Sequence, residues 1–378
     1  MSKLKNIKWK YYLNYIVIAI CTVFFAIMSL SGSISPSDIY LIEKVAIAIM
    51  LAVSLSMVVG FLGELSLGHA GFMCVGAYIG GKVAVLLSEV VGNELLVLII
   101  AVVIGGAAAA VCGVIIGLPA LRLRGDYLAI VTLAFGEIVR SLFMNSSDES
   151  FGGSLGLSTS AIRYDKSTLF IIALILVLAC LAVTQNLIRS KHGRAITSIR
   201  DNEIAAKATG INVTKYKLMV FTISSLFAGI AGVLYSFSNY TVQSTKFSYN
   251  YSIEILVMVV LGGMGSINGS IIAAALITFI DVKLQTILTG NLAVLQDLVY
   301  ALILIVIVVY NNTPALKNFR EKYNFKNIIA DFKNKKRDFT KERDDEAKWD
   351  RVPTKIDVDE VVSTVVAAPK NLDSKEVE

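Results

Sequence analysis

The chain alternates long apolar runs with short polar connectors. Runs of predominantly apolar residues recur between Tyr11 and Tyr310, and many reach the roughly 20 residues that a helix needs to cross a bilayer core. The run 169–188 (LFIIALILVLACLAVTQNLI) shows no period-two alternation, which excludes the strands of a membrane barrel. The pattern therefore predicts an all-α, polytopic integral membrane helical bundle.

Hydropathy predicts ten membrane-spanning helices. The run from Ser252 to Thr289 is expected to split into two spans, because the sequence LGGMGSING at 261–269 contains four glycines, and glycine disfavours a continuous helix and permits tight turns. The expected helices cover 11–31, 39–58, 69–88, 94–118, 126–146, 168–188, 218–238, about 246–263, the run from the glycines to Thr289, and 292–310.

Charge predicts the orientation of these helices, since cytosolic connectors carry an excess of Lys and Arg. The basic N-terminus (1–10), the LRLR segment at 121–124 and the basic connector 189–217 are expected to be cytosolic, and both termini with them. The chain then divides into a short N-terminus, a transmembrane domain over 11–310 and a charged tail over 311–378 that is expected to be flexible. A multi-pass protein of the cytoplasmic (inner) membrane is predicted.

The connector from Arg189 to Lys217, here called the polar island, holds seven Lys or Arg and two acidic residues. Its segment Ser198–Thr209 is composed of good helix formers, and Gly210 is well placed to end the helix. A short helix displayed between two spans suits docking into a groove of a soluble partner. The alternative is a cytosolic loop whose positive charge reflects the positive-inside rule and nothing more.

Two segments interrupt the apolar runs with glycines: Gly60–Gly71 (the first glycine segment) and Gly262–Gly269 (the second glycine segment). Irregular backbone at membrane depth survives only where protein or a water-filled cavity satisfies it, and transporters use such breaks as substrate sites. Close helix packing explains the glycines equally well.

Ionisable residues at membrane depth are costly and are candidates for function by default. Glu137 and Arg140 lie three residues apart on one helix face, which predicts a local ion pair. No set of these residues forms a ladder across the membrane, which argues against an ion-driven carrier. The set comprises Glu64, His69, Lys82, Glu137, Arg140, Glu254, Asp281 and Asp297.

Several motifs that resemble catalytic or metal-binding signatures do not indicate an enzymatic activity in this chain. The GxxxxGK spacing at 76–82 is followed by Val83 instead of a magnesium-binding hydroxyl and lies inside an apolar span, so the chain is not expected to hydrolyse ATP. The GxSxG match at 152–156 is expected to be an outside turn. The four cysteines lie in apolar runs without metal-ligand spacing. No catalytic residue, metal site, cofactor or nucleic-acid partner is predicted.

Four blocks, in order, resemble the membrane subunit of ABC importers for branched-chain amino acids (LivM-type permeases) over roughly residues 40–310. They are GELSLGHAGF at 63–72, LPALRLRGDYLAIVTLAFGEI at 118–138, RDNEIAAKATGINV at 200–213 and LGGMGS at 261–266. The chain departs from the family pattern at Glu64, where Gln is usual, at Asp126, and in its charged tail.

The resemblance implies a transport subunit that works with a sister permease, two cytosolic ABC ATPases and an extracytoplasmic binding protein. The island then resembles the loop that couples permease to ATPase. The coupling residues implied are Arg200, Asp201, Glu203, Ala205, Ala206 and Gly210. A zwitterion with an apolar side chain needs a largely apolar pathway with few fixed charges, so Glu64 would have to be protonated, paired or used to hold the ammonium group. The expected substrate-pathway residues are Glu64, Ser66, His69, Thr132, Glu137, Gly262, Gly263 and Gly265.

The alternatives within the family are permeases for urea or short amides, nucleosides or simple sugars. Outside the family, an ion-coupled secondary carrier and a structural membrane scaffold remain as different classes of protein.

Overall fold

The computed structural model describes residues 35–120, 125–162 and 166–287, with isolated positions between 298 and 309. The predicted helix 11–31, most of the predicted helix 292–310, the segment 121–124 and the tail 311–378 lie outside the described residues. The ten-helix count and the cytosolic placement of both termini therefore stay predictions.

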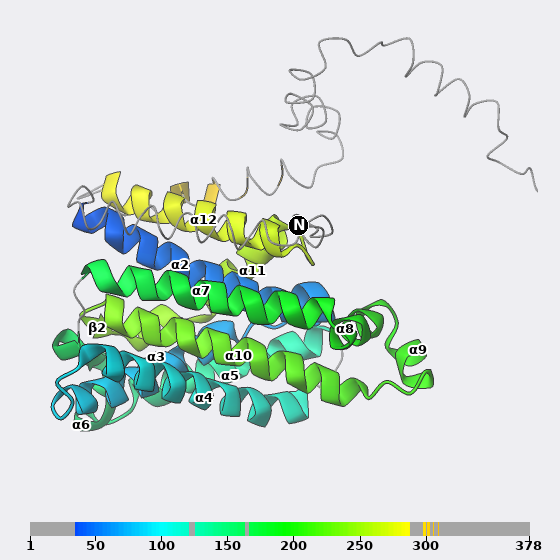
Figure 1. Cartoon of the computed structure of the whole chain (residues 1–378), viewed down its shortest axis with the longest axis horizontal. Coiled ribbons are helices and arrows are strands. Elements are labelled where there is room, and N and C mark those ends of the chain that lie inside the picture. Colours follow the sequence, from blue (N-terminus) through cyan, green and yellow to red (C-terminus); the bar gives the residue numbers. More distant parts are fainter. Residues whose placement is uncertain are drawn as a thin grey trace, which may run out of the picture. The chain divides into compact units, whose positions relative to one another are not determined.

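Seven helical stretches in the described part of the chain are long and apolar enough to cross a membrane. They confirm the predicted spans in this part of the sequence except the one near 246–263, and they define a multi-pass α-helical membrane protein (Figure 1). The stretches are α2 (Pro36–Ser56) continued by the π-helix η3 (Met57–Leu62), α3 (His69–Ser88), α4 (Glu94–Ala120), α5 (Asp126–Met144), α7 (Lys166–Arg189), α10 (Val213–Ser238) and α12 (Ile267–Ile287).

The predicted span near 246–263 is shorter than expected. Helix α11 (Tyr249–Gly262) has 14 residues, which at about 1.5 Å per residue extend roughly 21 Å, against about 30 Å of hydrocarbon core. A 3₁₀ turn, η6 (Ser244–Phe247), occupies the expected start. The positive φ of 91° at Gly263 ends the helix, so the predicted glycine break between two helices is confirmed.

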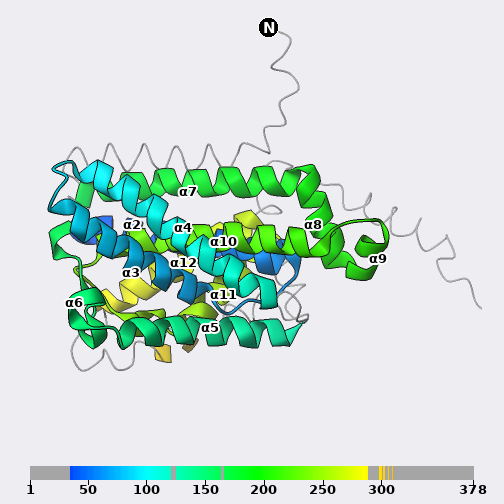
Figure 2. The ribbon, with the colours of Figure 1, turned by 90° about the horizontal axis from the view of Figure 1, so that it is seen from below.

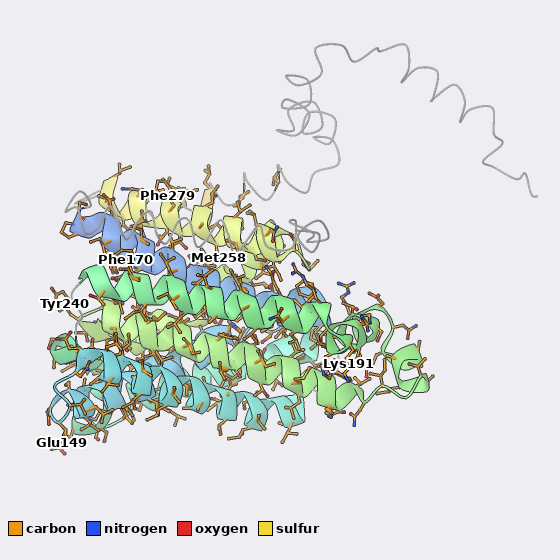
Figure 3. The ribbon with its side chains drawn as sticks, in the orientation of Figure 1. Glu149, Phe170, Lys191, Tyr240, Met258 and Phe279 are labelled. Atoms are coloured by element: carbon orange, nitrogen blue, oxygen red, sulfur yellow. The ribbon has the colours of Figure 1, made fainter. Side chains whose placement is uncertain are left out.

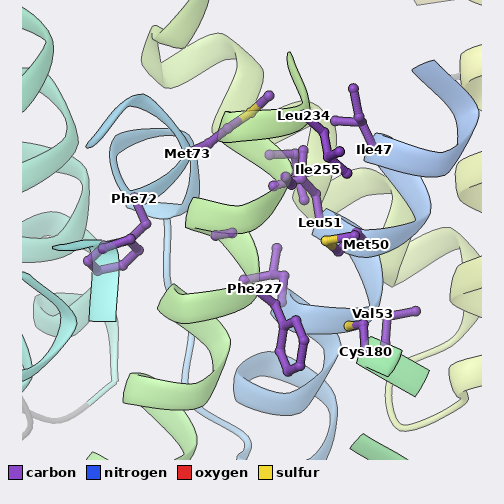
Figure 4. Packing of buried hydrophobic residues seen from close by; sticks show 14 of the residues in the cluster. Ile47, Met50, Leu51, Val53, Phe72, Met73, Cys180, Phe227, Leu234 and Ile255 are labelled. Atoms are coloured by element: carbon purple, nitrogen blue, oxygen red, sulfur yellow. The ribbon is translucent and has the colours of Figure 1, made fainter. Parts of the chain in front are cut away.

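Helix α10 packs against α2, α3 and α4 in the middle of the bundle. Its contact with α3 depends on glycine, because a Cβ placed on Gly76 would lie 2.1 Å from the carbonyl oxygen of Gly229. Small residues of this kind let helix backbones approach closely in membranes. Apolar side chains from α2, α3, α7, α10 and α11 fill the surrounding space (Figure 4). The GxxxxGK spacing lies inside α3 and is part of this packing.

The two ends of the bundle differ in structure (Figures 1 and 2). The short elements α6, η4, β1, η5, β2 and η6 gather at one end, where β1 and β2 pair antiparallel with Leu157 opposite Val242. The other end carries α8 and α9, so that Glu149 and Lys191 mark opposite ends in Figure 3. The short elements are α6 (Asp148–Phe151), η4 (Gly153–Leu155), β1 (Leu157–Ser158), η5 (Ser160–Ile162), α8 (Lys191–Asp201), α9 (Glu203–Ala208) and β2 (Thr241–Val242).

Large apolar side chains cover the outer faces of α4 and α5. They include Ile99, Val103, Ile115, Ile138 and Leu142, all at least half exposed. An apolar surface of this extent would favour aggregation in water. It suits contact with lipid or with another membrane protein.

Candidate functional site

The polar island folds into two helices, α8 and α9, where a single helix over 198–209 was predicted. Asn202 separates them, because its backbone is extended (φ −160°, ψ 105°). Its side-chain oxygen accepts hydrogen bonds from the backbone N–H groups of Ile204 and Ala205, each at 3.0 Å. Asparagine is a preferred N-cap for this reason. The predicted end at Gly210 is confirmed, since this residue has a φ of 84°.

The first glycine segment interrupts the path from α2 to α3. Helix η3 ends at Gly63, which has a φ of 80°, and residues 64–68 have no regular secondary structure. Side chains of other helices satisfy part of this backbone: Leu67 N–H donates to Thr132 Oγ1 at 3.0 Å, and Ala70 N–H donates to Ser252 Oγ at 3.1 Å. The irregular backbone is thus held by protein, as membrane depth requires.

The two glycine segments contact each other. A Cβ on Gly60 would lie 2.5 Å from the backbone nitrogen of Gly265. Within the second glycine segment, a Cβ on Gly262 would lie 2.4 Å from the backbone of Gly269. Close packing therefore accounts for these glycines. It also brings two distant chain breaks into one place, here called the glycine junction; the second break is formed by the positive φ values of Gly263 and Gly265.

Arg200 of the polar island reaches this junction. Its Nη1 donates a hydrogen bond to the carbonyl oxygen of Gly60 at 3.2 Å. A Cβ on Gly63 would lie only 2.6 Å from Arg200 Cγ, so the arginine stem packs directly on the end of η3. Arg200 also forms an ion pair with Asp201, with an N–O distance of 3.0 Å. The island thus touches the first glycine segment through one of the residues that the family resemblance marks.

Lys217 forms a second link, which the sequence reasoning missed. Its Nζ forms an ion pair with Glu64 and another with Glu203 Oε2, the latter at 3.2 Å. The Lys217 side chain is only 3% exposed. The structure confirms that Glu64 is paired, one of the states expected for it. The sequence contained a signal for this ion pair, because a lysine at the edge of an apolar span needs an acidic partner when it is buried. Glu64 and Glu203 were two carboxylates to which no partner had been assigned.

Glu203 joins this network to the surface of the island. Its other oxygen accepts a hydrogen bond from Lys207 at 2.9 Å. Partial burial alone would raise the pKa of Glu203, but the hydrogen bonds and charges of Lys207 and Lys217 outweigh it and hold the pKa below its ordinary value. The Glu203 carboxylate is therefore kept ionised between the two lysines.

The remaining predicted pathway residues are buried or make contacts nearby. His69 Nε2 lies 2.8 Å from Ser54 Oγ, and Ser66 is buried with no hydrogen-bond partner for its hydroxyl among the described residues. The predicted Glu137–Arg140 ion pair is confirmed at 2.7 Å. Glu137 also accepts a hydrogen bond from the backbone N–H of Tyr249 at 2.9 Å, which places it at the start of α11.

Broken helices within an apolar membrane bundle are typical of membrane transport proteins, and here a polar two-helix island contacts one of the breaks. The chain belongs to the family described as the permease component of branched-chain amino acid transport systems, whose model matches residues 39–308.

Curated relatives agree with this assignment. The chain is 36% identical over 274 residues to a high-affinity branched-chain amino acid transport system permease protein LivM of Salmonella typhimurium, covering 65% of this chain and 63% of the relative. It is 37% identical over 261 residues to the protein of the same description from Escherichia coli, covering 61% and 60%. A ribose import permease protein of Escherichia coli is 30% identical over 138 residues, covering 35% and 42%. The chain thus spans less than two thirds of these relatives, and no solved structure matches it significantly.

Proposed function

We propose that this chain is the membrane-spanning permease subunit of an ATP-driven importer of branched-chain amino acids. In this proposal it performs no covalent chemistry itself. A sister permease completes the membrane pathway, two cytosolic ABC ATPases supply energy, and an extracytoplasmic binding protein delivers the substrate. The polar island and both termini face the cytosol of a cell with the protein in its inner membrane.

The observation that carries the proposal is the double link from the island to the first glycine segment. Arg200 donates a hydrogen bond to the carbonyl of Gly60, and Lys217 bridges Glu203 of α9 to Glu64 in the first glycine segment. A displacement of α9 would be transmitted to residues 60–64 through these contacts, because buried ion pairs are costly to separate. Two nucleotide-dependent positions of the ATPases would then bias two positions of the broken helices.

Helix α9 offers the ATPases an apolar contact. Ile204 is 72% exposed, and it lies between the charged residues of the island. Burying such a side chain in a groove contributes about 1.5–3 kcal/mol. Ile204→Asp should therefore release the ATPases during copurification, whereas Leu155→Asp, equally exposed at the opposite end of the bundle, should not. Retention of the ATPases by the Ile204 variant would contradict the docking assignment.

The substrate is inferred from the relatives and from the apolar composition of the bundle. The relatives named for branched-chain amino acids match nearly twice as much of this chain as the ribose permease does. Reconstituted complexes should import labelled leucine, isoleucine or valine in an ATP-dependent and saturable manner. Import of urea or ribose without leucine would assign another cargo within the family.

An ion-coupled carrier is the competing class, and vesicles that hold the permease without ATPases distinguish it. We expect no uptake of leucine in such vesicles under a proton or sodium gradient. Uptake driven by either gradient would exclude an ATP-driven importer.

A further inference from the structure

The membrane helices α7 and α10 are longer than the hydrocarbon core of a bilayer. At about 1.5 Å per residue, the 24 residues of α7 and the 26 residues of α10 extend roughly 36 Å and 39 Å. The hydrocarbon core is about 30 Å thick, and the bilayer with its headgroups about 40–45 Å. The end of α7, the start of α8 and the start of α10 therefore lie at the depth of lipid headgroups, where Figure 3 shows Lys191.

An aromatic contact joins the starts of α8 and α10. The rings of His192 and Tyr216 lie 5.9 Å apart, centroid to centroid. Their neighbours in the chain are Lys191 and Lys215, so this contact gathers two lysines at one place, here called the lysine corner (Lys191, His192, Lys215 and Tyr216). Tyrosine is enriched where membrane proteins meet the headgroup layer.

The two lysines of the corner differ from other cations of the polar island. Lys191 and Lys215 are exposed and form no ion pair with any residue in the described part of the chain. Lys207 and Lys217, by contrast, both pair with Glu203. The paired lysines hold the island together and attach it to the bundle, whereas the lysines of the corner are available to an anion from outside the chain.

The charges at both helix starts are the reverse of the usual pattern. The N-terminal end of a helix is positive and favours acidic side chains in its first turn. The first turns of α8 and α10 contain no acidic residue, and each contains one lysine of the corner. An anion placed between the two helix starts would offset this repulsion. Ser190 and Asn212 already accept hydrogen bonds from backbone N–H groups there, which leaves the lysines as the groups that contact an anion.

We propose that the lysine corner binds the headgroup of an anionic phospholipid from the cytosolic leaflet. The ammonium groups of Lys191 and Lys215 donate hydrogen bonds to the phosphate oxygens. The acyl chains extend along α7, on which Ile175 and Val183 are exposed apolar side chains. The inference rests on the proposed function through the cytosolic placement of the island.

A lipid fits this place better than the ATPases do. The corner lies at headgroup depth, and the exposed apolar residue that suits a soluble partner, Ile204, is on α9. Each lysine or arginine near an anionic membrane surface strengthens binding by about fivefold. The two lysines should therefore favour an anionic over a zwitterionic phospholipid by about 25-fold.

Quenching by spin-labelled lipids tests the assignment in the full complex with its ATPases, in phosphatidylcholine vesicles. The native cysteines are replaced, and a fluorophore is attached to Asn186→Cys, an exposed position in the last turn of α7. Titrations with spin-labelled phosphatidylglycerol and phosphatidylcholine give the ratio of their binding constants beside the reporter. We expect a ratio of about 25, which Lys191→Gln combined with Lys215→Gln should abolish. Val183→Cys on the same helix replaces the reporter if Asn186→Cys does not assemble.

The control removes the same charge elsewhere. Lys207 on α9 and Lys246 in η6 are exposed lysines, and Lys207→Gln combined with Lys246→Gln should keep the wild-type ratio. Equal binding of the two lipids to the wild-type corner, or equal losses in both double variants, would overturn the proposal. A preference for phosphatidylglycerol that arises only after the ATPases are removed would also overturn it, since the corner would then be an ATPase contact.

ATP-driven uptake of leucine, measured in the same vesicles, separates failure of the lipid contact from failure of the proposed function. Uptake without a preference for phosphatidylglycerol refutes the lipid contact alone. The preference without uptake supports the lipid contact and contradicts the importer assignment.

Discussion

Replacing Lys217 by methionine tests the energetic role of the buried ion pairs. Methionine has a similar length but no charge, so Lys217→Met preserves the packing of α10 and removes the cation shared by Glu64 and Glu203. Their side chains are 12% and 23% exposed. Glu203 retains Lys207, whereas no other ion pair of Glu64 is found among the described residues. Glu64 is therefore the group that the substitution penalises.

Removing one partner of a buried ion pair typically costs about 3–5 kcal/mol. Glu64 and Lys217 are largely buried, with side chains 12% and 3% exposed, so Lys217→Met should lower the free energy of unfolding by about 3–5 kcal/mol. Adding Glu64→Gln removes the uncompensated charge and should recover most of this loss.

A double-mutant cycle of Lys217→Met and Glu64→Gln, measured by reversible unfolding in mixed detergent micelles, gives the interaction free energy directly. We expect about 2–3 kcal/mol, since directly interacting residues reach this range. The control pair is Lys217→Met with Glu89→Gln, a residue at the far end of α3. An interaction below about 0.5 kcal/mol for the first pair, or equal values for both pairs, would refute the reasoning.

Three further predictions concern single positions. Gly60→Ala should lower the yield of folded protein and cost about 1–3 kcal/mol, because its Cβ would meet backbone at 2.5 Å, whereas Gly92→Ala, with open space around it, should be neutral in thermal unfolding. Thr132→Val should cost about 1–3 kcal/mol, since the amide of Leu67 loses its acceptor in a partly buried site; hydrogen exchange at that amide should rise. The pKa of Glu203 is lowered by folding from its ordinary 4.5, so its stabilising contribution is complete above that pH and is lost as the pH falls through the folded-state value; the stability difference between wild type and Glu203→Gln should shrink accordingly.

The sequence predicted the helices because the bilayer imposes a simple rule on length and polarity. The spans between 39 and 238 lie within a few residues of their predicted positions, apart from α10, which begins at Val213 instead of 218. The error arose because Lys215 and Lys217 were assigned to the polar loop by charge alone. Tertiary pairing with Glu64 lets Lys217 lie on an apolar helix.

The candidate site was predicted less completely. The glycines marked both chain breaks, but the contact between Gly60 and Gly265 depends on the packing of α2 against the α11–α12 turn, which no local pattern encodes. Likewise, the sequence showed Glu64 as a carboxylate that could repel the substrate. Only the three-dimensional structure shows that Lys217 lies close enough to form an ion pair with it. The split of the island at Asn202 followed from a capping residue that was overlooked.

The ratio of leucine imported to ATP hydrolysed, in vesicles with the full complex, tests most directly whether Arg200 connects the polar island to the first glycine segment. Arg200→Gln removes the charged donor to Gly60; Arg194→Gln on the same helix, an exposed arginine, is the matched control. The account predicts near wild-type hydrolysis with at least tenfold less import for Arg200→Gln, and an unchanged ratio for Arg194→Gln. A wild-type ratio in the Arg200 variant, or equal losses in both variants, would contradict it.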